Sequence, residues 1–331
     1  MLRIITYFTQ RPSKGRAKTP TVNIKIIKHA LLNNIPSGSG IELVDGIIYI
    51  IGDDSEYLYG INHELRVIHQ VELFPSSDKK DGRIPKPLKP DFESMESFNI
   101  NGYPHLFVAG SGSLLPQRGK GYLIKLPTSY NKKHIVWEKD LNDLYSLITS
   151  HPDFSSDLEL NIESCFIAEN NFYFINRSGQ QLIRYPLAEM VEYLQNHSES
   201  TPFPEIFILD MPLIDGFEYT CSGACYYKDS VYITASCEAT DNAYDDGEII
   251  GSAIGSFKLS AVPERGRDKY QNSRIAVSNL TTIKDEKGVV LKTKWESVCI
   301  YEHDQDGTLA ALAIADPDNG TSELFLLEIK A

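Results

Sequence analysis

Short apolar runs separated by polar turns recur along this chain, and five of the segments share one plan. Each segment opens with Ser-Gly or Glu-Ser, continues through a few mostly apolar residues, reaches a polar turn and enters a second apolar run. The five segments begin at Ser39, Glu93, Glu163, Ser222 and Glu296. Apolar runs on either side of Asn-Gly or Asp-Gly are typical of β-hairpins, because both turn residues tolerate positive φ. The pattern therefore predicts one strand–turn–strand unit repeated five times.

Further strands are predicted after each hairpin. The hairpin turns are expected at Asp45-Gly46, Asn101-Gly102, Asn170-Asn171, Lys228-Asp229 and Asp306-Gly307. Third strands are expected at Tyr57–Ile61, Gly121–Leu126, Gln181–Tyr185, Ala253–Leu259 and Glu323–Ile329. Outer strands are expected at Arg66–Leu73, His134–Lys139, Glu205–Asp210 and Arg274–Leu280. Each repeat thus resembles one four-stranded blade of a propeller.

The last repeat runs out of chain before its outer strand, whereas the stretch Val22–His29 precedes the first repeat and has no partner. This stretch would supply the missing strand and leave no long sheet edge exposed. We therefore predict an all-β fold, a five-bladed β-propeller closed by an N-terminal strand, with residues 1–331 as a single domain. Five blades are favoured over six because five repeats are found.

The repeats are longer than blades of about 40–50 residues, so insertions are expected. Two insertions show helical periodicity, at Leu141–Ile148 and Leu187–Leu194, and are expected on the outside of the blades. The basic, proline-rich loop Lys79–Lys89 and the acidic stretch Glu238–Glu248 are long excursions between strands. Loops of that length are often functional or mobile.

The net charge of -13 and the pI near 5.1 argue against nucleic-acid polymers and anionic membranes as partners. Binding of a nucleic-acid polymer requires a concentrated basic face, and an anionic membrane also repels an acidic surface. No apolar stretch reaches the roughly 20 residues that span a bilayer, and the N-terminal 18 residues do not read as a signal peptide. We expect a monomer that is cytoplasmic as given, or exported if a signal peptide was removed.

Five cysteines, an odd number, occur without C-x-x-C spacing: Cys165, Cys221, Cys225, Cys237 and Cys299. Four of them lie among apolar residues close to the repeated motif. Buried thiols in a reducing compartment explain this pattern better than disulfides or metal ligands do.

The first residue of each repeat is the main candidate for function. In a propeller the first strand of every blade lines the central channel, so Ser39, Glu93, Glu163, Ser222 and Glu296 are expected to form a ring. Three carboxylates in a narrow channel repel one another and lose hydration, so they must bind protons or share a cation. Oxygen ligands of this kind suit Ca²⁺, which accepts six to eight oxygens. Alternatively, the ring residues only link the blades through hydrogen bonds to neighbouring backbone.

The order of the ring, together with Asp53-Asp54 after the second strand of the first blade, resembles the calcium-activated apyrases. These are five-bladed propeller nucleotidases. The resemblance implies that the five ring residues ligate an axial Ca²⁺ and that Asp53, Asp54 and Arg177 lie at the nucleotide site. The sequence departs from the family at Ser55, where the family has an arginine. The Ser-Gly and Glu-Ser repeat starts are also similar to those of phytase-like esterase propellers.

Three functions remain open from the sequence. The first is a calcium-dependent hydrolase of a phosphorylated or other anionic small molecule, in which Arg177 and Arg118 would clamp the anion and Asp53 or Asp54 would act as general base. The second is a metal-dependent lactonase or esterase. The third is a non-enzymatic binding propeller with a structural ion. For Asp53-Asp54 a plain hairpin turn, and for Arg118 a solvated surface position, are the simpler interpretations.

Overall fold

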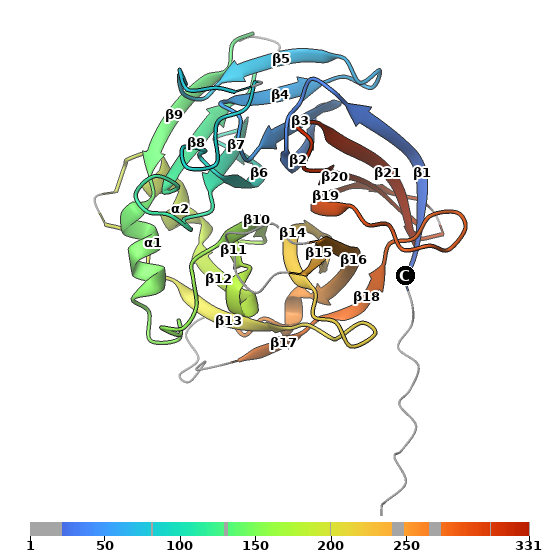
Figure 1. The fold of residues 1–331 in the computed structure, drawn as a ribbon. Helices are drawn as coiled ribbons and strands as arrows, with labels where there is room; N and C mark the ends of the chain where they lie inside the picture. Colours follow the sequence, from blue (N-terminus) through green and yellow to red (C-terminus); the bar gives the residue numbers. More distant parts are fainter. Residues whose placement is uncertain are drawn as a thin grey trace, which may run out of the picture.

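The computed structural model describes residues 22–80, 82–128, 132–198, 200–239, 248–264, 273–304 and 306–330. Its strands form five sheets around one axis, and each sheet is a blade (Figure 1). The predicted five-bladed β-propeller is therefore confirmed. In Figure 1 the first strand of each blade lies nearest the centre and the outer strands form the rim.

The first three blades follow one another in sequence order. Blade 1 contains β2 (Gly38–Val44), β3 (Ile47–Gly52), β4 (Tyr57–Ile61) and β5 (Val67–Glu72). Blade 2 contains β6 (Phe92–Ile100), β7 (Tyr103–Gly110), β8 (Lys120–Lys125) and β9 (Ile135–Asp140). Blade 3 contains β10 (Ile162–Ala168), β11 (Asn171–Asn176), β12 (Gln181–Pro186), β13 (Glu205–Asp210) and β17 (Arg274–Ala276).

The last two blades complete the ring. Blade 4 contains β14 (Thr220–Tyr227), β15 (Ser230–Ala239), β16 (Glu248–Lys258) and β18 (Ser278–Thr282). Blade 5 contains β19 (Lys294–His303), β20 (Leu309–Asp316), β21 (Ser322–Lys330) and β1 (Asn23–Leu32). Most of the acidic stretch Glu238–Glu248 lies outside the described residues.

The N-terminal strand closes the propeller as predicted. β1 pairs antiparallel with β21, from Asn23 opposite Lys330 to Leu32 opposite Ser322. One blade therefore holds strands from both ends of the chain, which leaves β21 with a partner on each side. The predicted closing strand ended at His29, whereas β1 continues for three more residues to Leu32.

The outer strand predicted at Arg274–Leu280 is wrong, because this segment serves two blades. Its first part, β17, pairs in parallel with β13 of blade 3. Its second part, β18, pairs antiparallel with β16 of blade 4. Ile275 and Val277 are both buried in the core between these blades. Burial of these two side chains fixes the segment across the junction. The backbone N–H of Val277 still donates to Asp210 of blade 3, and pairing with blade 4 begins at Ser278.

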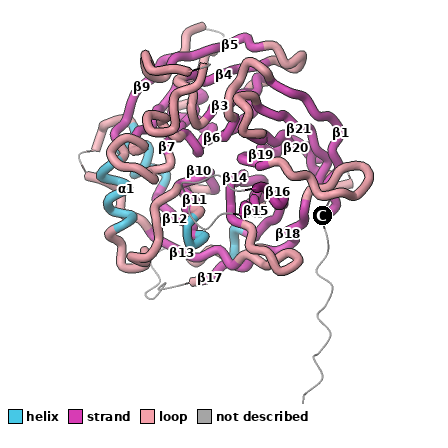
Figure 2. The backbone as a smooth tube through the Cα atoms, in the orientation of Figure 1, coloured by secondary structure: helices cyan, strands magenta, loops and turns pink. Residues whose placement is uncertain are grey.

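The two predicted helices are confirmed as α1 (Asn142–Thr149) and α2 (Leu187–Leu194). Figure 2 shows α1 at the periphery of the propeller, outside the strands. Leu144 and Ile148 of α1 are fully buried against the core between blades 2 and 3. No helix in the described part of the chain is long and apolar enough to cross a membrane. All five cysteines are buried and free, as expected.

The hairpin turns follow the sequence signals closely. Asp45 and Gly46 have φ of 50° and 77°, and Asn101 and Gly102 have 51° and 79°, which suits the tight turns predicted there. In blade 3 Ala168 pairs with Asn171. The turn residues are therefore Glu169 and Asn170, one position earlier than predicted.

Side chains from one blade complete the inner edge of the next blade. The first strands have no strand neighbour on the side that faces the axis, so their backbone groups need other partners. Ser222 Oγ donates to the backbone oxygen of Trp295 at 2.5 Å, and the backbone N–H of Ile300 donates to Cys225 Sγ at 3.3 Å. At the position that matches Cys225, Glu42 accepts a hydrogen bond of 2.8 Å from Ser97 Oγ in blade 2.

Glu42 makes the stability of the fold depend on pH. Burial raises the pKa of Glu42 to about 7, although the hydrogen bond from Ser97 lowers it. The folded state therefore holds this proton more tightly than the unfolded chain, whose glutamate pKa is about 4.3. The resulting stabilisation is fully present below about pH 4.3 and is lost as the pH rises through 7.

We expect Glu42→Gln to remove up to about 3 kcal/mol of the difference in unfolding free energy between pH 4.5 and pH 8. Denaturant titrations at a series of pH values measure this difference. Glu72→Gln, which replaces an exposed carboxylate of the same blade, is the control and should keep the parent pH dependence. Identical pH profiles for Glu42→Gln and the parent would contradict the prediction.

Candidate functional site

Each first strand carries a β-bulge at its ring residue. The pairing register shifts between Gly38 and Gly40, Phe92 and Ser94, Ile162 and Ser164, Cys221 and Gly223, and Trp295 and Ser297. The residue skipped in each blade is Ser39, Glu93, Glu163, Ser222 or Glu296. A bulge leaves one residue out of the ladder and redirects its side chain. The same irregularity in five blades therefore places five equivalent side chains at one level of the axis.

Two further rows of polar residues lie beside this ring. One row stands two positions before the ring residues: Ser37, Asp91, Asn161, Thr220 and Lys294. The other row comes from the second strands or the residues just after them, one position after the residue paired beside each bulge: Asp53, Ser111, Arg177, Ser236 and Asp316. Backbone hydrogen bonds such as Asp53 N to Ser37 O (3.1 Å) and Arg177 N to Asn161 O (2.9 Å) connect the rows. All of these residues except Ser111 and Ser222 line one cavity of about 1350 Å³.

Three carboxylates of the ring lie close to one another within this polar arrangement. Glu93, Glu163 and Glu296 each offer an oxygen, and these oxygens lie within 4.8 Å of one another. Glu163 and Glu296 are 5% and 4% exposed, and Glu296 Oε2 has no hydrogen-bond partner among the described residues. The structure therefore brings three of the five predicted ring ligands into contact distance of a single cation. We call Glu93, Glu163 and Glu296 the axial cluster.

Burial and mutual repulsion shift the pKa values of the axial cluster. Burial and the neighbouring carboxylates raise the pKa of Glu93 well above its usual range. The pKa of Glu296 rises to about 8, mainly through burial, although Lys294 opposes the shift. Burial also raises the pKa of Glu163, against the effect of Arg177 and Lys294. Carboxylates in this state gain stability from a proton or a metal cation.

The two ring serines make hydrogen bonds between blades. Ser39 Oγ donates to the backbone oxygen of Phe92, and Ser222 Oγ donates to that of Trp295. These carbonyls immediately precede Glu93 and Glu296, so the serines fix the backbone that carries the two glutamates. A hydroxyl oxygen that donates keeps its lone pairs. The predicted role of the serines as metal ligands therefore stays a prediction.

Arg177 lies beside the axial cluster, and its predicted role at a ligand site stays a prediction. Its Nη2 donates to Glu238 Oε1 at 2.7 Å, its Nε donates to Thr220 Oγ1 at 2.8 Å, and its Nη1 lies 3.6 Å from Glu163 Oε1. Burial alone would lower the pKa of Arg177, but Glu163 and Glu238 outweigh burial and raise it. A second cation, Lys294 Nζ, lies 3.1 Å from Glu296 Oε1.

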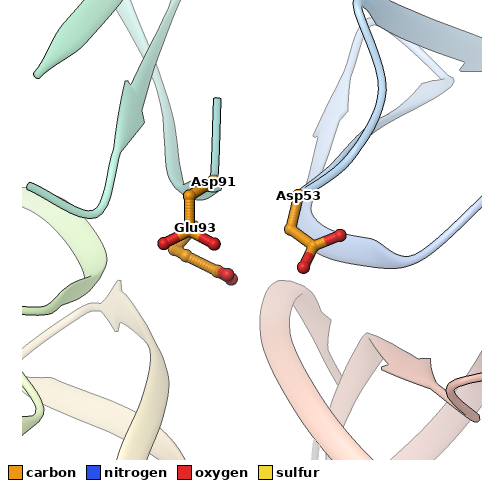
Figure 3. A group of neighbouring side chains, drawn as sticks. All are labelled: Asp53, Asp91 and Glu93. Atoms are coloured by element: carbon orange, nitrogen blue, oxygen red, sulfur yellow. The ribbon is translucent and has the colours of Figure 1, made fainter. Parts of the chain in front are cut away.

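Asp53 and Asp54 have different surroundings despite being neighbours. Asp54 is 3% exposed and accepts hydrogen bonds from Arg83 and from Ser37 Oγ (3.2 Å). Burial and Asp53 raise the pKa of Asp54 to about 6, although Arg83 opposes the shift. Asp53 lies across from Asp91 and Glu93 (Figure 3), and its side chain is 18% exposed, against 4% for that of Asp54. Asp53 is thus the better placed of the two for contact with a ligand.

The basic loop Lys79–Lys89 folds back over this acidic pair. Lys79, Arg83 and Lys89 form ion pairs with Glu56, Asp54 and Asp53, respectively. Three cations of the loop therefore meet three acids of one short segment between β3 and β4.

Arg118, predicted as an anion clamp, is 7% exposed, so it is not a solvated surface residue. Its Nη1 donates to Asp91 Oδ2 at 2.7 Å and to Ser113 Oγ at 2.8 Å. It lines the same cavity as the axial cluster.

Sequence reasoning did not single out several charged residues of the cavity, among them Lys89, Asp91, Glu238, Lys294 and Asp316. Asp91 and Lys294 occupy the row two positions before the ring, and Asp316 matches Asp53 in blade 5. Extending the repeat to these two rows would have found the three residues. Lys89 and Glu238 belong to or border the long insertions, which have no counterpart in other blades. Asp316 is 7% exposed, and burial together with Asp53 raises its pKa to about 7.

Residues 34–329 match the model of a family described as a family of unknown function, DUF6929. The match covers most of the chain, so this protein belongs to that family. No curated protein matched the chain. The resemblance to calcium-activated apyrases therefore stays a prediction.

Several solved structures match the chain at low identity. A glutaminyl cyclase from Myxococcus xanthus is 7% identical over 93% of this chain and 96% of that one, with a TM-score of 0.47. An α-L-arabinanase from Cellvibrio cellulosa is 13% identical over 89% of this chain and 92% of that one, with a TM-score of 0.46. The tail fiber of Staphylococcus aureus phage P68 is 11% identical over 93% of this chain, with a TM-score of 0.46. The chain spans about half of that tail fiber, 53% of its length.

Proposed function

We propose that this protein binds one Ca²⁺ at the axial cluster and hydrolyses a small anionic molecule, such as a phosphate ester, in the cavity above it. The observation that supports this proposal is the convergence of Glu93, Glu163 and Glu296 from three blades to within 4.8 Å. Glu296 is 4% exposed, and its Oε2, which has no hydrogen-bond partner among the residues that the structure describes, provides an open ligand position at the same place. Hard oxygen donors with no soft ligand among them favour Ca²⁺ over zinc or copper.

The charges around the axial cluster also favour a divalent ion. Six carboxylates belong to the axial cluster, form a second acidic group with Glu93, or share an ion-pairing cation with Glu163: Asp53, Asp91, Glu93, Glu163, Glu238 and Glu296. Four cations contact them: Lys89, Arg118, Arg177 and Lys294. With all groups ionised, six negative and four positive charges leave a net charge of -2, which one divalent cation neutralises.

A calcium ion held by the axial cluster would polarise an oxyanion substrate or acidify a water molecule. Asp316 lies in the same cavity, and its pKa near 7 suits a group that accepts and returns a proton at neutral pH. Arg118 and Arg177 line the cavity and carry the planar guanidinium groups that recognise oxyanions. The chain therefore supplies a proton acceptor and two anion-binding groups around one candidate cation site.

A binding propeller without catalytic activity is the second candidate. Arg177 and Lys294 already contact Glu163 and Glu296, so cations of the chain neutralise part of the cluster. In that case the ion would stabilise the fold without turnover. A lactonase or esterase would share the calcium requirement of the first proposal and differ only in its substrate.

Thermal unfolding of metal-stripped protein tests the cation site. We expect Ca²⁺ to stabilise the parent by about 2.7 kcal/mol when its concentration exceeds Kd a hundredfold, because it binds only the folded state. Glu163→Gln should abolish this response. Glu159→Gln, which changes an exposed glutamate of the same cavity, should keep it.

If neither Ca²⁺ nor Mg²⁺ shifts the unfolding transition of the parent, the axial cluster is a structural contact between blades and the proposal fails. If Ca²⁺ does stabilise the parent, phosphate esters, nucleotides and lactones can be assayed with and without chelator. Turnover that chelator abolishes would support the hydrolase, and the substrate that reacts would separate the phosphate-ester proposal from the lactonase.

A further inference from the structure

A second group of carboxylates adjoins the axial cluster and shares one member with it. Asp53, Asp91 and Glu93 also offer oxygens that lie within 4.8 Å of one another (Figure 3). They come from the end of the second strand of blade 1 and from the start of blade 2. We call these three residues the lateral cluster. Glu93 therefore stands between two positions where acidic groups are close enough to share a cation.

The lateral cluster already has a cation, the ammonium group of Lys89. Lys89 Nζ lies 2.7 Å from Asp91 Oδ1 and also contacts Asp53. The side chains of Lys89 and Asp91 are 14% and 6% exposed, so this contact is largely shielded from water. Lys89 reaches the cluster from the end of the basic loop, an insertion between blades 1 and 2.

The surroundings of Lys89 offer further hydrogen-bond donors to a ligand. An ammonium group has three N–H bonds, and the two carboxylates account for two of them. Arg118 binds the other oxygen of Asp91 and has an Nε without a hydrogen-bond partner among the described residues. Arg118 is 7% exposed, and both side chains line the cavity. An anionic group in the cavity would find these donors beside the axial cluster.

We propose that Lys89 is a tethered cation that takes the place of a second divalent ion, and that Lys89 and the axial Ca²⁺ together bind one oxyanion group of the ligand. The part concerning the axial ion rests on the proposed function. Occupation of the lateral cluster by Lys89 does not rest on it. The chemical class of ligand is a phosphoryl group or another tetrahedral oxyanion, whose oxygens can reach two cationic centres at once.

Calcium stoichiometry tests the role of Lys89 directly. Metal-stripped protein is titrated with Ca²⁺ by calorimetry, and bound calcium is measured after gel filtration. We expect one ion in the parent and two in Lys89→Met, because the variant leaves the lateral cluster without its ammonium group but keeps the apolar stem. Lys80→Met removes a cation from the same cavity without touching either cluster and should bind one ion. The double variant Asp53→Asn/Lys89→Met loses a lateral ligand as well and should also bind one.

Each outcome separates the two proposals. A gain of one ion in Lys89→Met supports the role of Lys89 even if the parent binds none, in which case the axial calcium site fails instead. Equal stoichiometry in the parent and in a folded Lys89→Met protein overturns the proposal that Lys89 replaces an ion.

Binding of methylphosphonate tests the ligand class. This experiment uses the double variant, so it can be done even if the single variant Lys89→Met does not fold. In the presence of Ca²⁺ we expect Asp53→Asn/Lys89→Met to bind methylphosphonate about tenfold more weakly than the parent, since one charge-assisted contact is lost. Lys80→Met should stay within about twofold of the parent. Equal affinity in the double variant and the parent would overturn the proposed contact between Lys89 and an oxyanion.

Discussion

Deleting residues 1–32 is expected to prevent this protein from folding to a soluble propeller. The deletion removes β1 and leaves β21 as an open edge that carries Phe325, Leu327 and Ile329. Val22 and Leu32, which are 7% and 6% exposed, are lost with the strand. Burial of two such side chains contributes roughly 3–6 kcal/mol, which is comparable with the 5–15 kcal/mol that typically stabilises a whole domain. An apolar open edge also favours aggregation.

A synthetic peptide of residues 22–33 offers a direct test by complementation. Adding this peptide during refolding should restore soluble protein with the circular dichroism spectrum of the parent, because it can pair with β21. A peptide with Ala30→Pro should rescue poorly, because Ala30 lies opposite Leu324 within the paired segment and proline fixes φ near about -65°, away from the φ of an antiparallel strand. A soluble deletion variant that unfolds cooperatively at the parent temperature would show that blade 5 does not need β1.

Replacement of Arg177 by methionine is expected to cost about 3–5 kcal/mol of unfolding free energy in metal-free protein. The guanidinium group pairs with Glu238 and lies close to Glu163, and its side chain is only 18% exposed. Removing the guanidinium group leaves two largely buried carboxylates with Lys294 as their main remaining cation, and the loss of one partner of a buried ion pair costs more than the pair itself contributes. Chemical denaturation in the presence of chelator measures the change.

Arg274→Met provides a matched control for this variant. Arg274 also lines the cavity and pairs with Asp210 at 2.6 Å, but the two side chains are 59% and 54% exposed. An exposed pair contributes about 0–1 kcal/mol, so this variant should unfold nearly as the parent does. Similar losses of unfolding free energy in Arg177→Met and Arg274→Met would mean that burial beside the axial cluster does not increase the contribution of Arg177 to stability. If the axial cluster binds Ca²⁺, added Ca²⁺ should recover part of the stability of Arg177→Met.

The fold of this protein was largely readable from its local sequence patterns. Hairpins are set by apolar alternation and by turn residues such as Asp45-Gly46, which act over a few neighbouring positions. The five-fold repeat of that unit then fixed the number of blades, and the spare N-terminal stretch identified β1 as the closing strand. The repeat also predicted that the five ring residues lie at the same height along the axis, because equivalent positions of a symmetric fold surround one axis.

Only the tertiary structure decided which charges lie together. Lys89 lies on a long insertion, and its contact with Asp53 and Asp91 depends on how that loop folds back. The segment Arg274–Leu280 reads as one strand, yet packing of Ile275 and Val277 between two blades divides it between their sheets. Local propensities carry no information about such contacts, because these arise between residues that are far apart in the chain.

The sequence by itself thus determined the propeller, its closure and the ring of Ser39, Glu93, Glu163, Ser222 and Glu296 as equivalent positions. The tertiary structure decided that three glutamates of this ring approach one another, while the serines bond to the next blade. It also placed Arg177 and Lys294 beside them and raised the pKa values of the buried acids. Burial and the distances between charges set these properties, and both exist only once the blades have closed around the axis.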